Sequence, residues 1–167
     1  MHRIVASISC RRRSAFGRIW RRLLAIAFHR EKPHLRGGYY LRIRPGESFI
    51  AAGFWGPEKD DLFRIRKELE ADVEEYRKHT ENPEFKAIWG DNKGECVKTA
   101  PKGFSKDHAN IEWIRYKQHL FTHSFTDNEV LQEGFTDTVN ECFQVMRPFF
   151  DYMSNILTTD LNGESLI

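Results

Sequence analysis

Alternating apolar and polar positions predict two adjacent strands in the first third of the chain. Over residues 39–44, Tyr39, Leu41 and Ile43 alternate with a tyrosine and two arginines, so one face of this strand is apolar. Residues 48–54 carry apolar or small side chains at both sets of alternate positions, which is typical of a central strand. Pro45-Gly46 lies between the two runs. The segment therefore predicts a β-hairpin, with a positive φ at Gly46 if the turn is of type II.

Apolar residues spaced three and four apart predict the helices. A stripe from Leu62 to Tyr76 follows Gly56-Pro57 and several acidic residues, which is typical of a helix start. The predicted helices cover a segment from residue 57 to 76, then 83–89 closed by Gly90, then 111–117, and a long C-terminal segment over 135–156. Pro148 should kink the last helix or split it in two.

The remaining patterns complete an α+β fold. Residues 119–125 alternate as a strand, residues 94–98 form a further strand candidate, and 99–106 is a loop with Pro101 and Gly103. Thr126 or Asp127 caps a short helix. We expect a mainly antiparallel sheet with helices packed on one side.

Charge divides the chain near residue 30. Residues 1–30 contain eight arginines and no acidic residue, whereas residues 31–167 carry 18 basic and 24 acidic residues and are net −6. This predicts a basic leader over 1–30, disordered or foreign to the domain, and a single domain over 31–167. The leader is also compatible with an import presequence, or with an arm that contacts nucleic acid or an anionic membrane.

Composition excludes several classes of protein. Aromatic residues make up 13 % of the chain, which is incompatible with a wholly disordered or collagen-like sequence. No apolar run approaches the roughly 20 residues of a membrane-spanning helix. Three widely spaced cysteines without a CxxC pair favour a reducing compartment, and neither a P-loop nor a GxGxxG motif is present.

Candidates for metal or nucleophilic chemistry are weak. His119 and His123 have the i, i+4 spacing of a helical metal site, but their surroundings read as a strand face that is half exposed, so we predict no metal site. Asp107-His108 could supply a base and its carboxylate, although adjacent residues rarely face each other. Cys96, in its predicted strand, is expected to be an inert buried thiol.

The stretch from residue 98 to 117 is the best candidate for ligand binding. It concentrates lysines, an arginine and hydroxyl side chains around a Pro/Gly loop within an acidic domain, which is a pattern that can hold an anion. The alternative is an ordinary solvated loop. The predicted ligand-binding residues are Arg42, Lys98, Thr99, Lys102, Lys106, His108, Arg115 and Lys117.

Several motifs agree in order and spacing with one bacterial family. They are Gly37-Gly-Tyr-Tyr-Leu41, Pro45-Gly-Glu-Ser-Phe49, Gly53-Phe-Trp55, Lys98-Thr-Ala-Pro-Lys-Gly-Phe104, Lys106-Asp-His108, Arg115-Tyr-Lys117 and Arg147-Pro-Phe-Phe150. Over about residues 31–167 the chain resembles the conserved hypothetical proteins called domain of unknown function 2461. The resemblance implies a cytoplasmic α+β protein and no particular reaction. The family's usual N-terminal part, helical and then basic, is not recognisable in residues 1–30, and Ala109 stands where a proline is common.

Three functional hypotheses follow from these observations. The first is a domain that binds an anionic or phosphate-bearing small molecule through the Lys-rich loop. The second is an enzyme that acts on such a ligand with His108 as acid or base, and the third is a scaffold without a small-molecule site. No cofactor is indicated, and any contact with nucleic acid would be through the basic leader alone.

Overall fold

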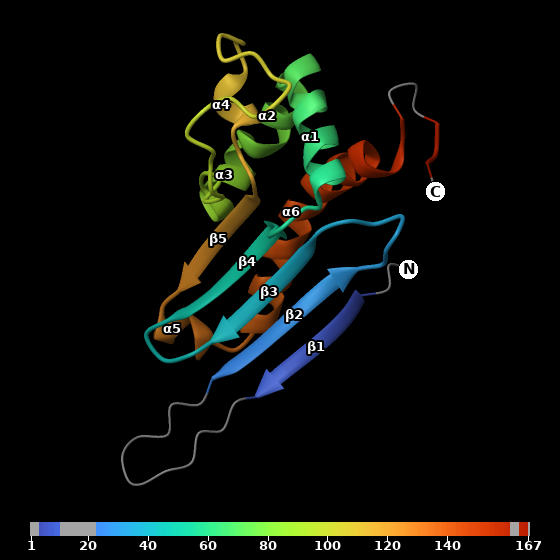
Figure 1. Cartoon of the computed structure of the whole chain (residues 1–167). Coiled ribbons are helices and arrows are strands. Elements are labelled where there is room, and N and C mark those ends of the chain that lie inside the picture. The colour runs from blue at the N-terminus through green and yellow to red at the C-terminus, as the bar shows by residue number, and fades with distance from the viewer. Residues whose placement is uncertain (1–3, 11–22, 161–163, 167) are drawn as a thin grey trace, which may run out of the picture.

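A single antiparallel sheet forms one layer of the molecule. The computed structural model describes residues 4–10, 23–160 and 164–166. Its strands are β1 (Ile4–Cys10), β2 (Leu24–Arg30), β3 (Gly38–Ile43), β4 (Ser48–Phe54) and β5 (His119–Phe125). They lie in the order β1-β2-β3-β4-β5, and every neighbouring pair is antiparallel (Figure 1).

The predicted hairpin is confirmed. Tyr39 opposes Ala52, so the apolar faces of β3 and β4 coincide. The Glu47 amide donates to the Arg44 carbonyl at 2.9 Å, and Gly46 has φ +73°. Because Pro45 stands at the second position of this turn and a positive φ at the third, the turn is of type II.

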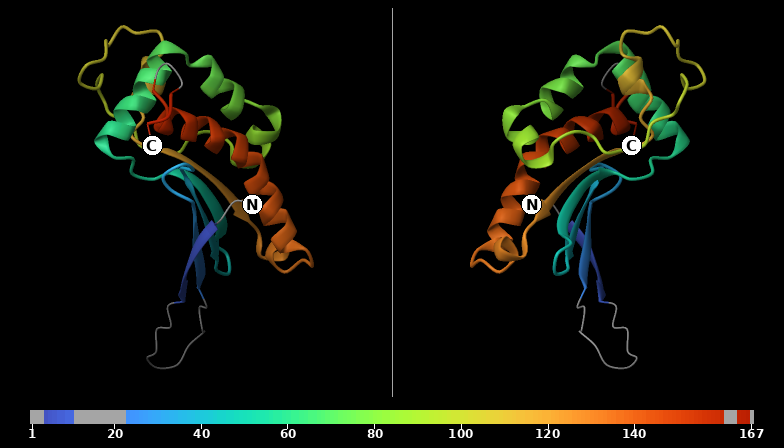
Figure 2. Two further views of the ribbon diagram at one scale, coloured as in Figure 1. Left: turned by 90° about the vertical axis from the view of Figure 1, so that its right-hand side faces the viewer. Right: turned by 90° about the vertical axis from the view of Figure 1, so that its left-hand side faces the viewer.

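Helices cover one face of the sheet, as expected for this α+β fold (Figure 2). The structure contains α1 (Lys59–Ala71), α2 (Glu74–Thr80), α3 (Pro83–Trp89), α4 (Ile111–Ile114), α5 (Asp127–Val130) and α6 (Phe135–Thr158). Asn82 caps α3 by accepting from the Glu84 and Phe85 amides, and Thr126 forms a capping box with Glu129 at the start of α5. Both caps are local signals of the sequence.

The predicted helix from residue 57 to 76 is two helices, which is a correction. Asp72 leaves the helical region with φ −149° and ψ 103°, so α1 ends at Ala71. Its carboxylate accepts a hydrogen bond from the Glu74 amide at 2.9 Å, and α2 begins there. The apolar stripe continues through the break because Leu69, Val73 and Tyr76 are all buried.

The core lies between the sheet and α6. This helix is continuous across Pro148 and bends, so its first half follows the sheet and its second half passes beneath α1 and α2 (Figure 2). Pro148 cannot donate to the preceding turn, which accounts for the bend. Phe150 lies 4.9 Å from Tyr39 and 5.5 Å from Phe54 between ring centroids, joining helix and sheet.

Part of the predicted leader belongs to the sheet. Residues 24–30 form β2 and pair with β3 from Leu24↔Ile43 to His29↔Gly38. Arg30 is buried, forms an ion pair with Asp151 of α6, and lies over the Phe150 ring. The change in charge at residue 31 therefore coincides with the end of a strand. Residues 11–22, with most of the leader's arginines, lie outside the described residues.

No helix in the described part of the chain combines the length and the apolar character needed to cross a membrane.

Candidate functional site

A short antiparallel ladder joins the start of β5 to the preceding loop. Cys96 and Tyr116 form an isolated bridge, the Val97 amide donates to the Arg115 carbonyl at 2.9 Å, and the Lys117 amide donates to the Glu95 carbonyl at 2.7 Å. The predicted strand over 94–98 is reduced to this bridge. Likewise, the predicted helix over 111–117 ends as α4 at Ile114, because residues 115–117 take part in the ladder.

The ladder brings together cationic residues from both of its sides. The Arg115 guanidinium donates from Nη2 to the Lys98 carbonyl at 2.8 Å, which fixes it against the first residue of the loop. Its Nε is buried and has no hydrogen-bond partner in the described structure. Lys117 forms an ion pair with Glu95 at 3.3 Å. Both side chains thus lie on the ladder, close to the start of the loop at residue 98.

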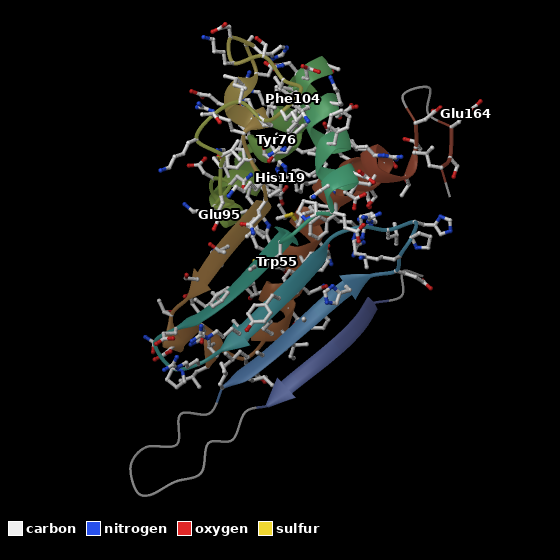
Figure 3. The ribbon with its side chains drawn as sticks, viewed as in Figure 1. Trp55, Tyr76, Glu95, Phe104, His119 and Glu164 are labelled. Atoms are coloured by element: carbon white, nitrogen blue, oxygen red, sulfur yellow. The ribbon has the colours of Figure 1, made fainter. Side chains whose placement is uncertain are left out.

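The loop over 98–108 is anchored by one aromatic residue. The Phe104 ring lies 5.8 Å from that of Phe63 on α1, and Lys67 Nζ lies 4.9 Å above it. The Phe104 amide donates to the Pro101 carbonyl at 3.1 Å, and Gly103 has φ +90°, so residues 101–104 form a second turn with a left-handed glycine. Figure 3 places Phe104 at the outer end of the helical layer.

The loop lysines are the exposed part of this site. Lys98, Lys102 and Lys106 are exposed, and none forms an ion pair with another described residue. Thr99 is also exposed, and its hydroxyl has no partner within the described ranges. Residues 95–117 carry five cationic and three acidic side chains, a net +2 within residues 31–167, which are net −6. The segment is therefore a local positive region within residues 31–167, although the chain as a whole carries a formal net charge of +2.

A buried polar cluster supports the base of the ladder. The Tyr76 hydroxyl lies 2.9 Å from His119 Nδ1, and the Asn92 amide nitrogen lies 3.4 Å from each of these two atoms (Figure 3). Asn92 Oδ1 accepts from the Gly94 and Leu120 amides at 2.8 and 2.9 Å. Because α2, the 92–94 segment and β5 all meet here, the cluster fixes the position from which the ladder begins.

Burial keeps this cluster neutral. It lowers the pKa of His119 to about 3, with a smaller contribution from the Arg66 cation, and it raises the pKa of the Tyr76 phenol. Since the Asn92 amide can only donate, we assign Nδ1 of His119 as an acceptor and place the ring proton on Nε2. That nitrogen is buried without a partner in the described structure.

Arg66 of α1 holds the other side of the ladder. Its Nε donates to the Ile114 carbonyl at 2.9 Å and its Nη2 to the Tyr116 carbonyl at 3.2 Å. Asn110 adds a hydrogen bond to the Leu69 carbonyl at 3.1 Å. The Arg66 bonds satisfy carbonyl groups at and just after the end of α4, and the Asn110 bond satisfies one near the end of α1.

His108 is half-buried within the loop. Its Nδ1 accepts from the Asn110 amide at 3.1 Å, so Nε2 is the only ring nitrogen left for proton transfer. The neighbouring Asp107 is exposed, and its amide donates to the Ser105 hydroxyl at 3.2 Å. No contact joins its carboxylate to the His108 ring in the described structure, which leaves the hypothesis of a catalytic pair without support.

Arg42 does not join the other predicted ligand-binding residues. It opposes Phe49, near the end of the sheet where Ser48 pairs with Phe125, whereas the ladder adjoins His119 at the opposite end of β5. β5 is seven residues long, so these ends lie roughly 20 Å apart. Arg42 instead shares Glu47 with Arg44.

The environments of Cys96 and His119 differ from those predicted. Cys96 is exposed instead of buried, because its segment forms only a bridge, although partial burial still raises its thiol pKa against the opposing influence of Arg115 and Lys117. His119 is 1 % exposed, and His123 Nδ1 lies 2.8 Å from the Ile88 carbonyl. Both histidines face the helices. No group of three or more potential metal ligands occurs among the described residues.

A separate hollow lies between α2, α3 and α6. It has a volume of about 480 Å³, and its apolar lining includes Phe85 and Phe149. Its rim combines Lys78 with Glu84 and Glu141, so it presents charges of both signs. None of the predicted ligand-binding residues lines it.

Comparison with known proteins places most of the chain in one family. A family model described as "Conserved hypothetical protein (DUF2461)" matches residues 12–152. No curated protein and no solved structure matches the chain. The family match covers β2, the hairpin, the ladder and most of α6.

Proposed function

The chain belongs to the DUF2461 family of conserved hypothetical proteins, and for this member we propose binding of an anionic ligand at the ladder and loop. The proposed site consists of Lys98, Thr99, Lys102, Lys106, His108, Arg115 and Lys117. We call it the cationic loop site. The observation that carries the proposal is the set of three exposed lysines, none of which pairs with an acidic residue in the described part of the chain, beside a fixed arginine.

Rigidity of the base supports this proposal. Arg115 is held by the Lys98 carbonyl, and its backbone is held by Val97 and Arg66 through the ladder and α4. An arginine that is already ordered loses less conformational entropy when it binds an oxyanion than a free side chain does. Lysines on the loop add positive charge without fixed geometry. This combination suits a phosphate-sized group at the surface.

Ligand-dependent stability tests the proposal. Phosphate should raise the free energy of unfolding by RT ln(1 + [L]/Kd), about 2.7 kcal/mol at one hundred times Kd. Urea unfolding is measured in phosphate and in chloride at equal ionic strength, because screening alone changes surface electrostatics. Equal stability in the two salts would overturn the proposal.

Matched double variants localise the effect. Lys102→Ala with Lys106→Ala should remove most of the phosphate-dependent gain. Lys59→Ala with Lys78→Ala removes the same charge from α1 and α2 and should leave the gain unchanged. Lys67 is unsuitable as a control because it lies over the Phe104 ring. A gain that falls equally in both double variants would indicate a general response to charge.

A further inference from the structure

The face of the sheet that points away from the helices is composed of small and aromatic residues. Tyr39, Ile50 and Phe121 point toward the helices and are buried, so the alternate positions point outward. The outward positions of β2 to β5 are Ala25, Ala27, His29, Gly38, Tyr40, Arg42, Phe49, Ala51, Gly53, Leu120, Thr122 and Ser124. No described helix covers this face (Figure 2). An exposed face of an antiparallel sheet is ordinarily polar, so the small and aromatic side chains of this face indicate a surface that binds another molecule.

Acidic side chains are absent from this whole layer. The chain has 24 acidic residues, yet none lies in β1, β2, β3, β4 or β5. Acidic residues are frequent instead in helices such as α1 and α2. The outward positions of β2 to β5 carry one arginine and one histidine. The outward positions of these strands therefore carry no negative charge, although Glu47 lies in the turn that follows β3.

Three aromatic rings occupy this face or its end. The Tyr40 and Phe49 rings lie 5.7 Å apart across the β3–β4 pair. Trp55 follows β4 and is 40 % exposed. A Cβ built on Gly38 would lie 3.4 Å from the Trp55 ring and 3.2 Å from His29, so the indole lies over the outward side of β3. Figure 3 shows Trp55 at the end of the sheet where β4 ends.

Arginine accompanies the rings at the other end of the face. The Arg42 guanidinium carbon lies 5.6 Å from the Phe49 ring centroid. Arg42 Nε is buried from solvent and has no hydrogen-bond partner among the described residues. Arg44 lies beside it, and Glu47 is the one carboxylate that pairs with both arginines. Glu47 offsets one of the two positive charges, and the Asp127 carboxylate, which accepts from the Gly46 amide at 2.7 Å, lies at the same turn.

We propose that this face binds single-stranded nucleic acid. Bases stack on the exposed ring of Trp55 and on the accessible parts of Tyr40 and Phe49, a contact that tolerates any base sequence because every base has a π-face. Gly38, Ala51 and Gly53 are buried, so the bases contact the rings and not the small residues between them. Arg42 and Arg44 neutralise a backbone phosphate. This surface is distinct from the cationic loop site and does not depend on it.

Binding of a labelled oligonucleotide tests the proposal. The probe is fluorescein-labelled oligothymidylate of about twelve nucleotides, a length within the range used by single-strand binding folds. Fluorescence anisotropy with the full chain at low salt should show saturable binding. Trp55→Ala should weaken it about five-fold or more, while Trp55→Phe, which keeps a ring, should recover most of the affinity. Absence of binding at low salt would overturn the proposal.

Two control variants separate this face from other surfaces. Leu166→Ala removes an apolar side chain that is 46 % exposed beyond α6 and should leave affinity unchanged. Arg42→Gln should reduce the slope of log K against log salt by about 0.7, whereas Arg64→Gln on α1 should not. Binding that is insensitive to Trp55→Ala and Arg42→Gln would place the nucleic acid elsewhere, for example on the arginine-rich residues 1–30, and would overturn the proposal.

Sedimentation tests the competing occupant, a second copy of the chain. The proposal expects Trp55→Ala to leave the oligomeric state unchanged. A dimer that Trp55→Ala dissociates, together with no oligothymidylate binding, would identify the face as a contact between copies and would overturn the proposal.

Discussion

The Tyr76 hydroxyl and His119 Nδ1 lie 2.9 Å apart in the interior, joining α2 to the first residue of β5. Both side chains are almost completely buried. Asn92 is within 3.4 Å of both atoms and also binds the Leu120 amide. The relationship matters for function because the ladder that carries Arg115 and Lys117 begins immediately before His119.

Acid should destabilise the protein through His119. Burial holds its folded pKa at about 3, against an ordinary value of 6.5, so below pH 6.5 the unfolded chain binds a proton that the folded chain does not. This contribution is complete above pH 6.5 and is lost as pH falls toward 3, at about 1.4 kcal/mol for each pH unit. Urea unfolding between pH 7 and pH 5 measures the slope.

His119→Asn identifies the responsible group, because asparagine keeps a polar atom near Tyr76 and does not titrate. This variant should show a shallower decline of unfolding free energy between pH 7 and pH 5 than the parent. His34→Asn, at an exposed position, should keep the parent slope. His79, whose pKa burial also lowers, contributes equally to both variants. Identical slopes in His119→Asn and the parent would contradict the assignment of a buried neutral imidazole.

Arg66→Ala should loosen the ladder. Its two hydrogen bonds are donated by a charged group to the Ile114 and Tyr116 carbonyls, so their loss should cost about 1.5–3 kcal/mol. Amide hydrogen exchange at residues 111–117 should accelerate in this variant. Arg64→Ala, from the exposed face of the same helix, serves as the control. Unchanged exchange in Arg66→Ala would show that the ladder is held by other contacts.

Three glycines should respond differently to alanine. Gly56 has open space around its Cβ position and no positive φ, so Gly56→Ala should be nearly neutral. Gly46→Ala should cost about 1 kcal/mol, because φ is +73° while the space is open. At Gly53 a Cβ would lie 1.9 Å from the His119 carbonyl oxygen, so Gly53→Ala should cost the most. Chemical denaturation that ranks Gly46→Ala above Gly53→Ala would contradict this account of the β4–β5 contact.

Local sequence signals account for most of the fold. Alternation over 39–44 and 48–54, Pro45-Gly46, Gly90 and the stripe in the C-terminal helix each act within a few residues, so the hairpin, α3 and α6 could be predicted. The break at Asp72 was missed because the apolar stripe continues across it. The strand over 24–30 could not be predicted, because the arginines of residues 1–30 made the whole segment resemble a basic leader and its apolar run is short.

The candidate site was only partly accessible to sequence reasoning. Its loop could be predicted from the lysines and from Pro101 and Gly103, because these residues lie close together in the sequence. The support that Tyr76, Asn92 and Arg66 give to the ladder could not be predicted, because these residues come together only when α1, α2 and β5 pack in the folded protein. Tyr76 appeared as one residue of an apolar stripe, and Arg66 as one charge on a helix face. Arg42 was grouped with the loop although the sheet holds it at the opposite end.

The most direct test of the account is a phosphate titration followed by the backbone amide resonances of uniformly ¹⁵N-labelled protein, with chloride as the matched salt. The account predicts saturable shifts confined to residues 95–108 and 115–117, with a common Kd, and their loss in Lys102→Ala with Lys106→Ala. Shifts that do not saturate, or that occur equally around Lys59 and Lys78, would contradict the existence of an anion site at the cationic loop.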